Sequence, residues 1–169
     1  IMIAVGQYAV LNDKAGTLPL QYYVYPRHTE DARICFQETP AMINYFNRKI
    51  GFVYPWEKYA QVIVADFIEG GMENASATTL MDDITVFDAR VRVDQSPTSL
   101  LAHELAHQWW GDVVTCKDWR HLWLNEGFAT YFEALYREHH DGDDEFRYDL
   151  LRLPRTYPDE DAKTSPRAL

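Results

Sequence analysis

His103-Glu104-Leu105-Ala106-His107 lies in the stretch from Ser96 to Gly111, whose pattern is typical of a helix. Two histidines four positions apart point the same way on a helix, so their imidazoles can bind one metal ion from one face. Glu104 lies beside this pair and can take a proton from a water bound to such a metal. A lone match of this form is more often the solvated polar face of an ordinary helix, so its interpretation depends on the surrounding sequence.

The sequence contains signals for the beginning of this helix at Ser96-Pro97 and for its end at Gly111. Ser96 can accept a hydrogen bond from a backbone N–H group of the first turn, and Pro97 suits the first helical position, where no donor is needed. A helical pattern continues to Trp110, and Gly111 is a natural end because glycine readily adopts the left-handed conformation. We therefore expect a helix that ends near Trp110 and carries the motif in its middle.

A second helix offers a third metal ligand. Large apolar residues recur at steps of three and four from Leu124 to Tyr136, which is typical of a helix packed on a core, and Glu126 falls in its first turn. Eighteen residues separate His107 from Glu126, enough for a loop that lets the two helices lie side by side. His103, His107 and Glu126 form a His₂Glu set with one open position, which is typical of catalytic zinc sites. We expect one Zn²⁺ per chain.

Asn125 precedes the third expected ligand and allows two interpretations. Its carboxamide could hydrogen-bond to a ligand histidine and fix the tautomer of the imidazole. It could equally cap the first turn of the second helix, a position that asparagine favours. The sequence does not choose between these two roles.

Two separate blocks of the chain carry a family resemblance. The first block has two parts, H-E-L-A-H-Q-W-W-G-D at residues 103–112 and N-E-G-F-A at residues 125–129. The second block is G-G-M-E-N at residues 70–74. In their order and spacing these blocks resemble the zinc aminopeptidases of the gluzincin group, which includes the membrane alanyl aminopeptidases and leukotriene hydrolase; intervening stretches look like the bacterial branch. The resemblance implies an α+β fold, namely a thermolysin-like metallopeptidase catalytic domain with a mixed sheet and active-site helices.

The resemblance assigns substrate binding to Gly70, Gly71, Met72, Glu73 and Asn74. Glu73 would bind the free ammonium group of a peptide through charge-assisted hydrogen bonds. Gly70 and Gly71 would let the substrate backbone approach closely and pair with this segment, as in strand addition. Met72 could line the pocket for the first substrate side chain or simply fill the core. Without the zinc motif, the same five residues would be interpreted as a turn with an exposed acid.

The function implied is a zinc-dependent aminopeptidase that removes N-terminal residues from peptides by means of metal-activated water, with Glu104 as the general base. In the family a tyrosine stabilises the oxyanion, but its position lies downstream of this chain, so we expect the chain alone to hydrolyse poorly. Two alternatives are a zinc-binding scaffold for protein interaction and an epoxide hydrolase of the leukotriene type. The presence of both Glu104 and Glu73 argues against the scaffold.

Length and net charge limit the number of domains and the kinds of partner that the chain could have. With 169 residues and 47% hydrophobic content, we expect a single partial catalytic domain, with a hairpin and sheet region at 1–95 and a zinc-binding helical region at 96–169. The net charge of −10 argues against nucleic acid and suits a cationic peptide N-terminus. Neither a membrane-spanning segment nor a signal peptide is recognisable, so cytoplasmic and exported locations both stay open. The start at Ile1 indicates a piece of a longer protein, whose flanking domains would be further partners.

The other elements follow from local pattern. We expect a β-hairpin of Ile1–Leu11 and Leu18–Tyr25, and a helix from Thr29 to Lys49 that Pro40 kinks or divides. Most tryptophans should lie in the core, and the acidic residues between Glu138 and Asp161 should be solvated. Two cysteines without a paired pattern indicate neither a disulfide framework nor a second zinc site. Two further strands are expected, at Gln61–Phe67 and Met72–Leu80.

Overall fold

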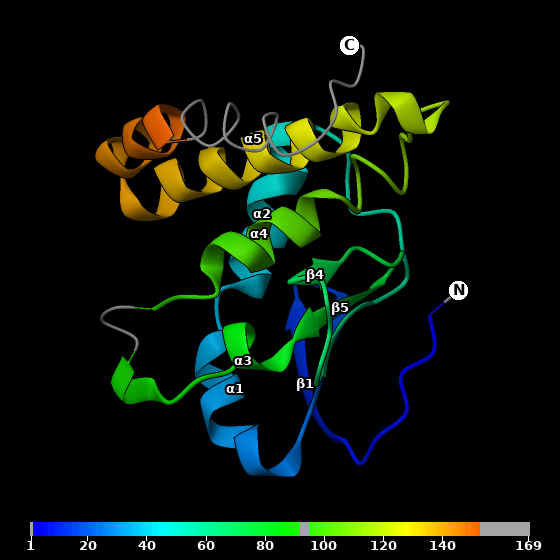
Figure 1. Ribbon diagram of the computed structural model, residues 1–169, viewed down its shortest axis with the longest axis vertical. Coiled ribbons are helices and arrows are strands. Elements are labelled where there is room, and N and C mark those ends of the chain that lie inside the picture. The colour runs from blue at the N-terminus through cyan, green and yellow to red at the C-terminus, as the bar shows by residue number, and fades with distance from the viewer. Residues whose placement is uncertain (1, 92–94, 153–169) are drawn as a thin grey trace.

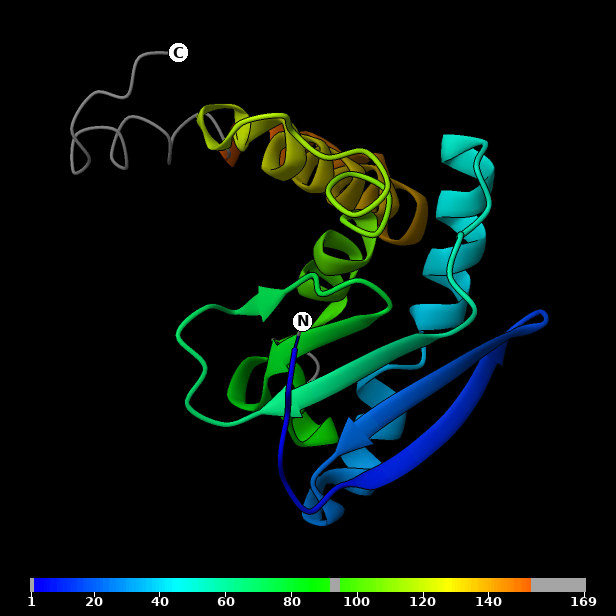
Figure 2. The same cartoon turned by 90° about the vertical axis from the view of Figure 1, so that its right-hand side faces the viewer.

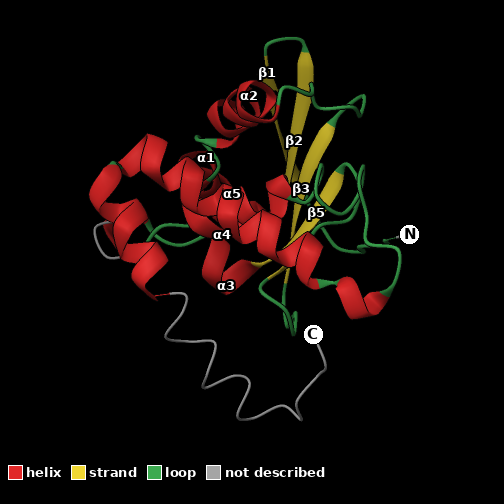
Figure 3. Cartoon of the chain, turned by 90° about the horizontal axis from the view of Figure 1, so that it is seen from above, coloured by secondary structure: helices red, strands yellow, loops and turns green. Residues whose placement is uncertain are grey.

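The fold is a mixed five-stranded sheet covered on one side by helices, as seen in a computed structural model that describes residues 2–91 and 95–152. Figure 3 shows α1, α2, α4 and α5 gathered on one side of the strands. The strand order is β1-β2-β3-β5-β4, with parallel pairing of β2 with β3 and of β3 with β5. This confirms the expected α+β class. The strands are β1 (Ala9–Ala15), β2 (Leu18–Val24), β3 (Tyr59–Val64), β4 (Gly71–Met72) and β5 (Ala77–Met81).

The expected hairpin is present but shorter at its start and tighter at its turn. β1 and β2 pair antiparallel from Ala9 opposite Val24 to Ala15 opposite Leu18. Gly16 has φ 63°, a conformation that glycine adopts without strain, so the chain reverses within two residues. Residues 12–14, which lie between the two expected strands, therefore continue the first strand. The first strand begins at Ala9, and Ile1 lies outside the described residues.

The segment from Thr29 to Lys49 forms two helices, α1 (Thr29–Cys35) and α2 (Thr39–Ile50). Pro40 stands in the first turn of α2, where its missing N–H group costs no hydrogen bond, so it divides the segment as expected. Gly51 ends α2 with φ 74°. The core between helices and sheet contains completely or almost completely buried side chains from both layers, including Leu20, Phe36, Phe46, Ile63, Leu80, Leu101 and Leu105.

The stretch Met72–Leu80 is not one strand, as we expected, but two antiparallel strands joined by a turn. Gly71 pairs with Leu80, and Met72 pairs with Thr79. Ser76 has φ 60°, and the N–H group of Ala77 donates to the carbonyl of Asn74 at 2.8 Å. The turn at residues 73–76 therefore lies at the edge of the sheet.

The two helices of the zinc motif lie side by side next to this edge (Figures 1 and 2). They are α4 (Thr98–Ala106) and α5 (Trp123–Asp141). The N–H group of Thr98 donates to Ser96 Oγ at 3.2 Å, as expected for Ser96, but Pro97 is the N-cap and not the first helical residue. Our expectation that α4 continues to Trp110 was wrong, because the N–H groups of Gln108 and Trp109 bond three residues back instead of four. His107 is therefore the C-cap, and the motif occupies the end of the helix.

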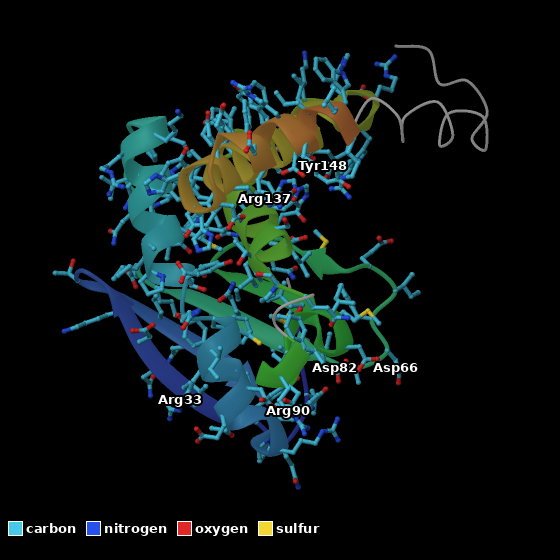
Figure 4. The ribbon with its side chains drawn as sticks, turned by 90° about the vertical axis from the view of Figure 1, so that its left-hand side faces the viewer. Arg33, Asp66, Asp82, Arg90, Arg137 and Tyr148 are labelled. Carbon is cyan, nitrogen blue, oxygen red and sulfur yellow. The ribbon has the colours of Figure 1, made fainter. Side chains whose placement is uncertain are left out.

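Residues 143–152 are also helical and are tied to α5 by Arg137, which lies in the helical layer together with Tyr148 (Figure 4). Arg137 Nη1 donates to both carboxylate oxygens of Asp149 at 2.7 Å. Asp149 is buried, so the expectation of a uniformly solvated acidic stretch was wrong at this position. The parts of that stretch and of the helical region beyond residue 152 lie outside the described residues.

The four tryptophans closest in sequence to the metal ligands divide into two pairs, and the fifth, Trp56, packs against the core. Trp109 is buried and Trp110 packs against the core, as expected, whereas 82% of Trp119 and 59% of Trp123 are exposed. Cys35 and Cys116 form no disulfide. Within the described part of the chain, no helix is both long and apolar enough to span a bilayer. The remaining short helices are α3 (Asp82–Thr85), η1 (Pro26–His28), η2 (Ala89–Val91) and η3 (Trp119–His121).

Candidate metal centre

Three side chains from α4 and α5 converge on one point. His103 Nε2 and His107 Nε2 are 3.1 Å apart, and Glu126 Oε2 lies 3.4 Å from each of them. In a tetrahedral zinc site with bonds of about 2.0–2.1 Å, two ligand atoms are about 3.3–3.4 Å apart. The three donor atoms therefore have the spacing that one tetrahedral ion requires, and their residues could hold a metal. All three residues line one cavity, so a fourth position would be open to a ligand.

The second nitrogen of each imidazole also has a partner. His107 Nδ1 lies 3.0 Å from the carbonyl oxygen of Trp110, and His103 Nδ1 lies 3.3 Å from Glu133 Oε2. Such partners accept a hydrogen bond from Nδ1–H, which keeps the proton on Nδ1 and leaves the Nε2 lone pair for a metal. Neither contact was predicted from the sequence. The spacing of Glu126 and Glu133, seven residues apart on one expected helix, was the signal that could have identified Glu133, because that spacing brings both to one face.

Asn125 lies next to the centre but has neither of its expected roles. Its Oδ1 accepts a hydrogen bond from the backbone N–H group of Cys116 at 3.1 Å. This bond ties α5 to the loop that follows α4. Leu122 is the N-cap of α5, so Asn125 does not cap the helix, and the imidazoles have the partners described above.

Glu104 is buried against the edge of the sheet. A Cβ atom placed on Gly71 would lie only 2.3 Å from Glu104 Oε1, so the glycine makes room for the carboxylate. Glu104 Oε2 is buried and has no hydrogen-bond partner among the described residues. Burial raises the pKa of Glu104 to about 7, although the charges of His103 and His107 oppose the shift. A carboxylate with a pKa in this range can both accept and return a proton near neutral pH.

The ligand side chains interact electrostatically with one another and with Glu133. Burial lowers the pKa of His103, but hydrogen bonds to Glu126 and Glu133 outweigh this effect and raise it to about 10. The same hydrogen bonds to His103 and His107 lower the pKa of Glu126 to about 2. The charged form of His103 and the ionised form of Glu126 therefore stabilise each other, and a divalent cation would interact with the same carboxylate.

The segment Gly70–Asn74 lines the same cavity, which has a volume of about 1040 Å³. Glu73 Oε1 is 4.0 Å from His107 Nδ1, and Met72 is 41% exposed at the cavity wall. The structure thus brings all of the expected site residues to one cavity: Gly70, Gly71, Met72, Glu73, Asn74, His103, Glu104, His107, Asn125 and Glu126.

Asp112, which was not among the expected site residues, also lines this cavity. Its Oδ2 is buried and lacks a hydrogen-bond partner within the described part of the chain. Burial, together with the negative charge of Glu73, raises the pKa of Asp112 to about 6. The cavity therefore contains a further carboxylate, in addition to the expected metal ligand Glu126, the expected base Glu104 and the expected amine-binding residue Glu73.

Comparisons with known proteins agree with this arrangement. The sequence profile described as "Peptidase family M1 domain" matches residues 34–168. Aminopeptidase N of Streptomyces lividans is 39% identical over 140 residues, which cover 78% of this chain and 16% of that protein. Glutamyl aminopeptidase of Mus musculus is 34% identical over 147 residues (85% and 16%), and probable aminopeptidase 2 of Sulfurisphaera tokodaii is 32% identical over 145 residues (82% and 19%). The chain thus spans less than a fifth of the length of these relatives.

Proposed function

The chain belongs to peptidase family M1, and from this premise we propose that it carries the catalytic centre of a zinc-dependent aminopeptidase. One observation carries the proposal: a His₂Glu group with tetrahedral spacing, a buried carboxylate and a second carboxylate from the sheet edge all line one cavity. The metal group alone would suit many hydrolases. Glu73 adds a carboxylate that would bind a free substrate amino group through charge-assisted hydrogen bonds.

His103, His107 and Glu126 would hold the zinc ion, the metal to which this donor set is best suited. Bound zinc would supply a Lewis acid for the scissile carbonyl and lower the pKa of a water molecule. Glu104 would accept the proton of the attacking water and donate it to the leaving amine. Its burial against Gly71 supports this role, since burial holds the pKa of Glu104 near 7.

Glu73 would bind the substrate ammonium group, and β4 would align the substrate backbone. β4 lies at the edge of the sheet and pairs only with β5 among the described strands, which leaves its other side available to an extended peptide. Met72 and Trp119 line the cavity and would contact the first substrate side chains. With the ammonium group fixed, one residue at a time would be released from the N-terminus.

The oxyanion donor is proposed to come from outside the described residues. No tyrosine lines the cavity in the part of the chain that the structure describes. The loss of one oxyanion donor commonly lowers kcat by about 10²–10³. The chain by itself should therefore bind zinc but hydrolyse peptides slowly.

The proposal is tested by zinc content and by cleavage of matched aminoacyl substrates with free and acetylated N-termini. Both this chain and the full-length protein that carries it should be measured. We expect one zinc per chain and cleavage of the free substrate alone. Equal cleavage of the acetylated substrate would refute the aminopeptidase assignment, and absence of bound zinc would refute the metal centre.

A further inference from the structure

Gln108 connects the metal helix to the turn that carries Glu73. It follows His107 directly and its side chain is completely buried. Its Nε2 donates to the carbonyl oxygen of Glu73 at 2.8 Å, and its Oε1 accepts from the N–H group of Ser76 at 2.7 Å. One carboxamide thus binds both ends of the turn at residues 73–76. Gln108 thereby joins the end of the metal-binding helix to a turn that lies 35 positions earlier in the sequence.

The residue type matches these two partners. A backbone carbonyl can only accept and a backbone N–H group can only donate, so the turn requires one donor and one acceptor on the same short side chain. Glutamine supplies both, and the two partners fix the orientation of its carboxamide. The hydroxyl group of Tyr54 lies 3.3 Å from the same Oε1 and further holds it in place.

The turn has other hydrogen bonds, but they join it to the sheet. The Ala60 N–H group donates to the Ser76 carbonyl at 2.9 Å, and Asn74 Nδ2 donates to Thr79 Oγ1 at 3.0 Å. These bonds set the shape of the turn without setting its distance from the metal ligands. The hydrogen bonds of Gln108 do both, since Gln108 and the ligand His107 are neighbours in the chain.

We propose that Gln108 is a positioning residue that holds the ammonium-binding carboxylate of Glu73 at a fixed distance from the metal centre and so sets the preference for free N-termini. This inference rests on the proposed aminopeptidase function. Glu73 Oε1 lies 4.0 Å from His107 Nδ1, so a small shift of the turn changes where a substrate amine sits relative to the metal ligands. A misplacement of about 1 Å can cost a factor of about 10² in rate.

Two variants separate the two hydrogen bonds. Gln108→Met removes both bonds at similar volume, whereas Gln108→Glu keeps the acceptor for Ser76 and removes the donor to Glu73. Gln61→Met is the matched control, because Gln61 is equally buried but its side-chain oxygen accepts a hydrogen bond from Thr39 instead of from the turn. Any general effect of losing a buried glutamine should appear in that control.

The first experiment needs no enzymatic activity. Amide hydrogen exchange at Ser76, measured by NMR on this chain, should be about tenfold faster in Gln108→Met, as expected for the loss of one buried hydrogen bond. It should be close to wild type in Gln108→Glu and in Gln61→Met. Unchanged exchange at Ser76 in Gln108→Met would overturn the proposal.

The second experiment measures steady-state kinetics of the full-length protein. Gln108→Met should raise KM for a free-amine substrate about tenfold and change kcat less, while zinc content stays at the wild-type level. In a Glu73→Gln background the same substitution should have no further effect, because Gln108 acts through Glu73. Effects that multiply would overturn the proposal, as would a Gln108→Met variant with wild-type KM.

The two proposals fail in different ways. If the wild-type enzyme cleaves acetylated and free substrates equally, the aminopeptidase function is refuted and with it the role of Gln108 in substrate preference. The exchange rate at Ser76 then still decides whether Gln108 holds the turn. If the wild-type enzyme discriminates but Gln108→Met discriminates equally well, the inference about Gln108 alone is refuted.

Discussion

Gly71→Ala should displace the proposed base without removing the metal. The added Cβ atom would lie 2.3 Å from Glu104 Oε1 and 2.4 Å from its Cδ. Carbon and oxygen atoms in ordinary contact are about 3.5 Å apart, so the carboxylate must move by about 1 Å. Glu104 can move by rotating its side chain, at a cost of about 0.5–1.5 kcal/mol in an unfavourable rotamer. A misplacement of this size should lower kcat about 10²-fold.

The assay combines kcat on a free-amine substrate, zinc content and the melting temperature of the full-length protein. We expect a large loss of kcat with near-normal zinc content and a small loss of stability. Gly70→Ala is the matched control, because its Cβ atom would meet the terminal methyl groups of Ile84, at 3.2 Å, and Leu100, at 3.7 Å, and not Glu104. At saturating substrate that variant should keep kcat within a few-fold because Glu104 stays in place, and any loss of substrate binding at Gly70 should appear in KM. Wild-type kcat in Gly71→Ala would show that Glu104 does not need its observed position, and the reasoning would fail.

Three further predictions concern the same centre. Glu104→Gln should keep zinc and lower kcat by about 10²–10⁴, and retained turnover would refute the role of this carboxylate. Glu133→Ala should weaken zinc binding about 10–100-fold in a chelator competition, since it removes the partner of His103 Nδ1; unchanged affinity would contradict this role. Zinc affinity should also rise with pH between about 6 and 9, by about tenfold per unit for each proton released. The reason is that the hydrogen bonds to Glu126 and Glu133 outweigh burial and raise the pKa of metal-free His103 to about 10, so zinc must displace a proton; a pH-independent affinity would disprove it.

The metal ligands could be predicted because their spacing follows from helix geometry. His103 and His107 lie four residues apart, and the apolar stripe after Leu124 placed Glu126 on a second helix. The division of the helical segment at Pro40 could also be predicted, since proline has a defined effect on helix hydrogen bonds. These features depend on residues that are close in sequence.

The features that were missed depend on contacts between distant segments or on unusual backbone conformations. Ser76 reverses the chain with positive φ although it is not glycine, so an apparently continuous strand concealed the turn that carries Glu73. The role of Gln108 was invisible because its partners are 32 and 35 positions away. The helix α4 ended early for a similar reason, since tighter three-residue hydrogen bonds after Ala106 leave no strong signal in the sequence.

The charges of the cavity explain how such a site would reject a blocked peptide. Glu73, Glu104, Asp112 and Glu126 share one cavity, and mutual repulsion adds to burial in raising the pKa of Glu104 and of Asp112. A metal cation and a substrate ammonium group would each relieve part of this repulsion. An acetylated N-terminus brings no charge, so it would leave the Glu73 carboxylate, only 19% exposed, without a partner in a site closed by the substrate. Sites that leave a buried polar group unpaired discriminate far more strongly than sites that only lose an apolar contact, by factors of about 10⁴–10⁵. Discrimination would therefore come from the cost of an unpaired carboxylate, and that cost depends on how firmly Gln108 prevents Glu73 from turning away to solvent.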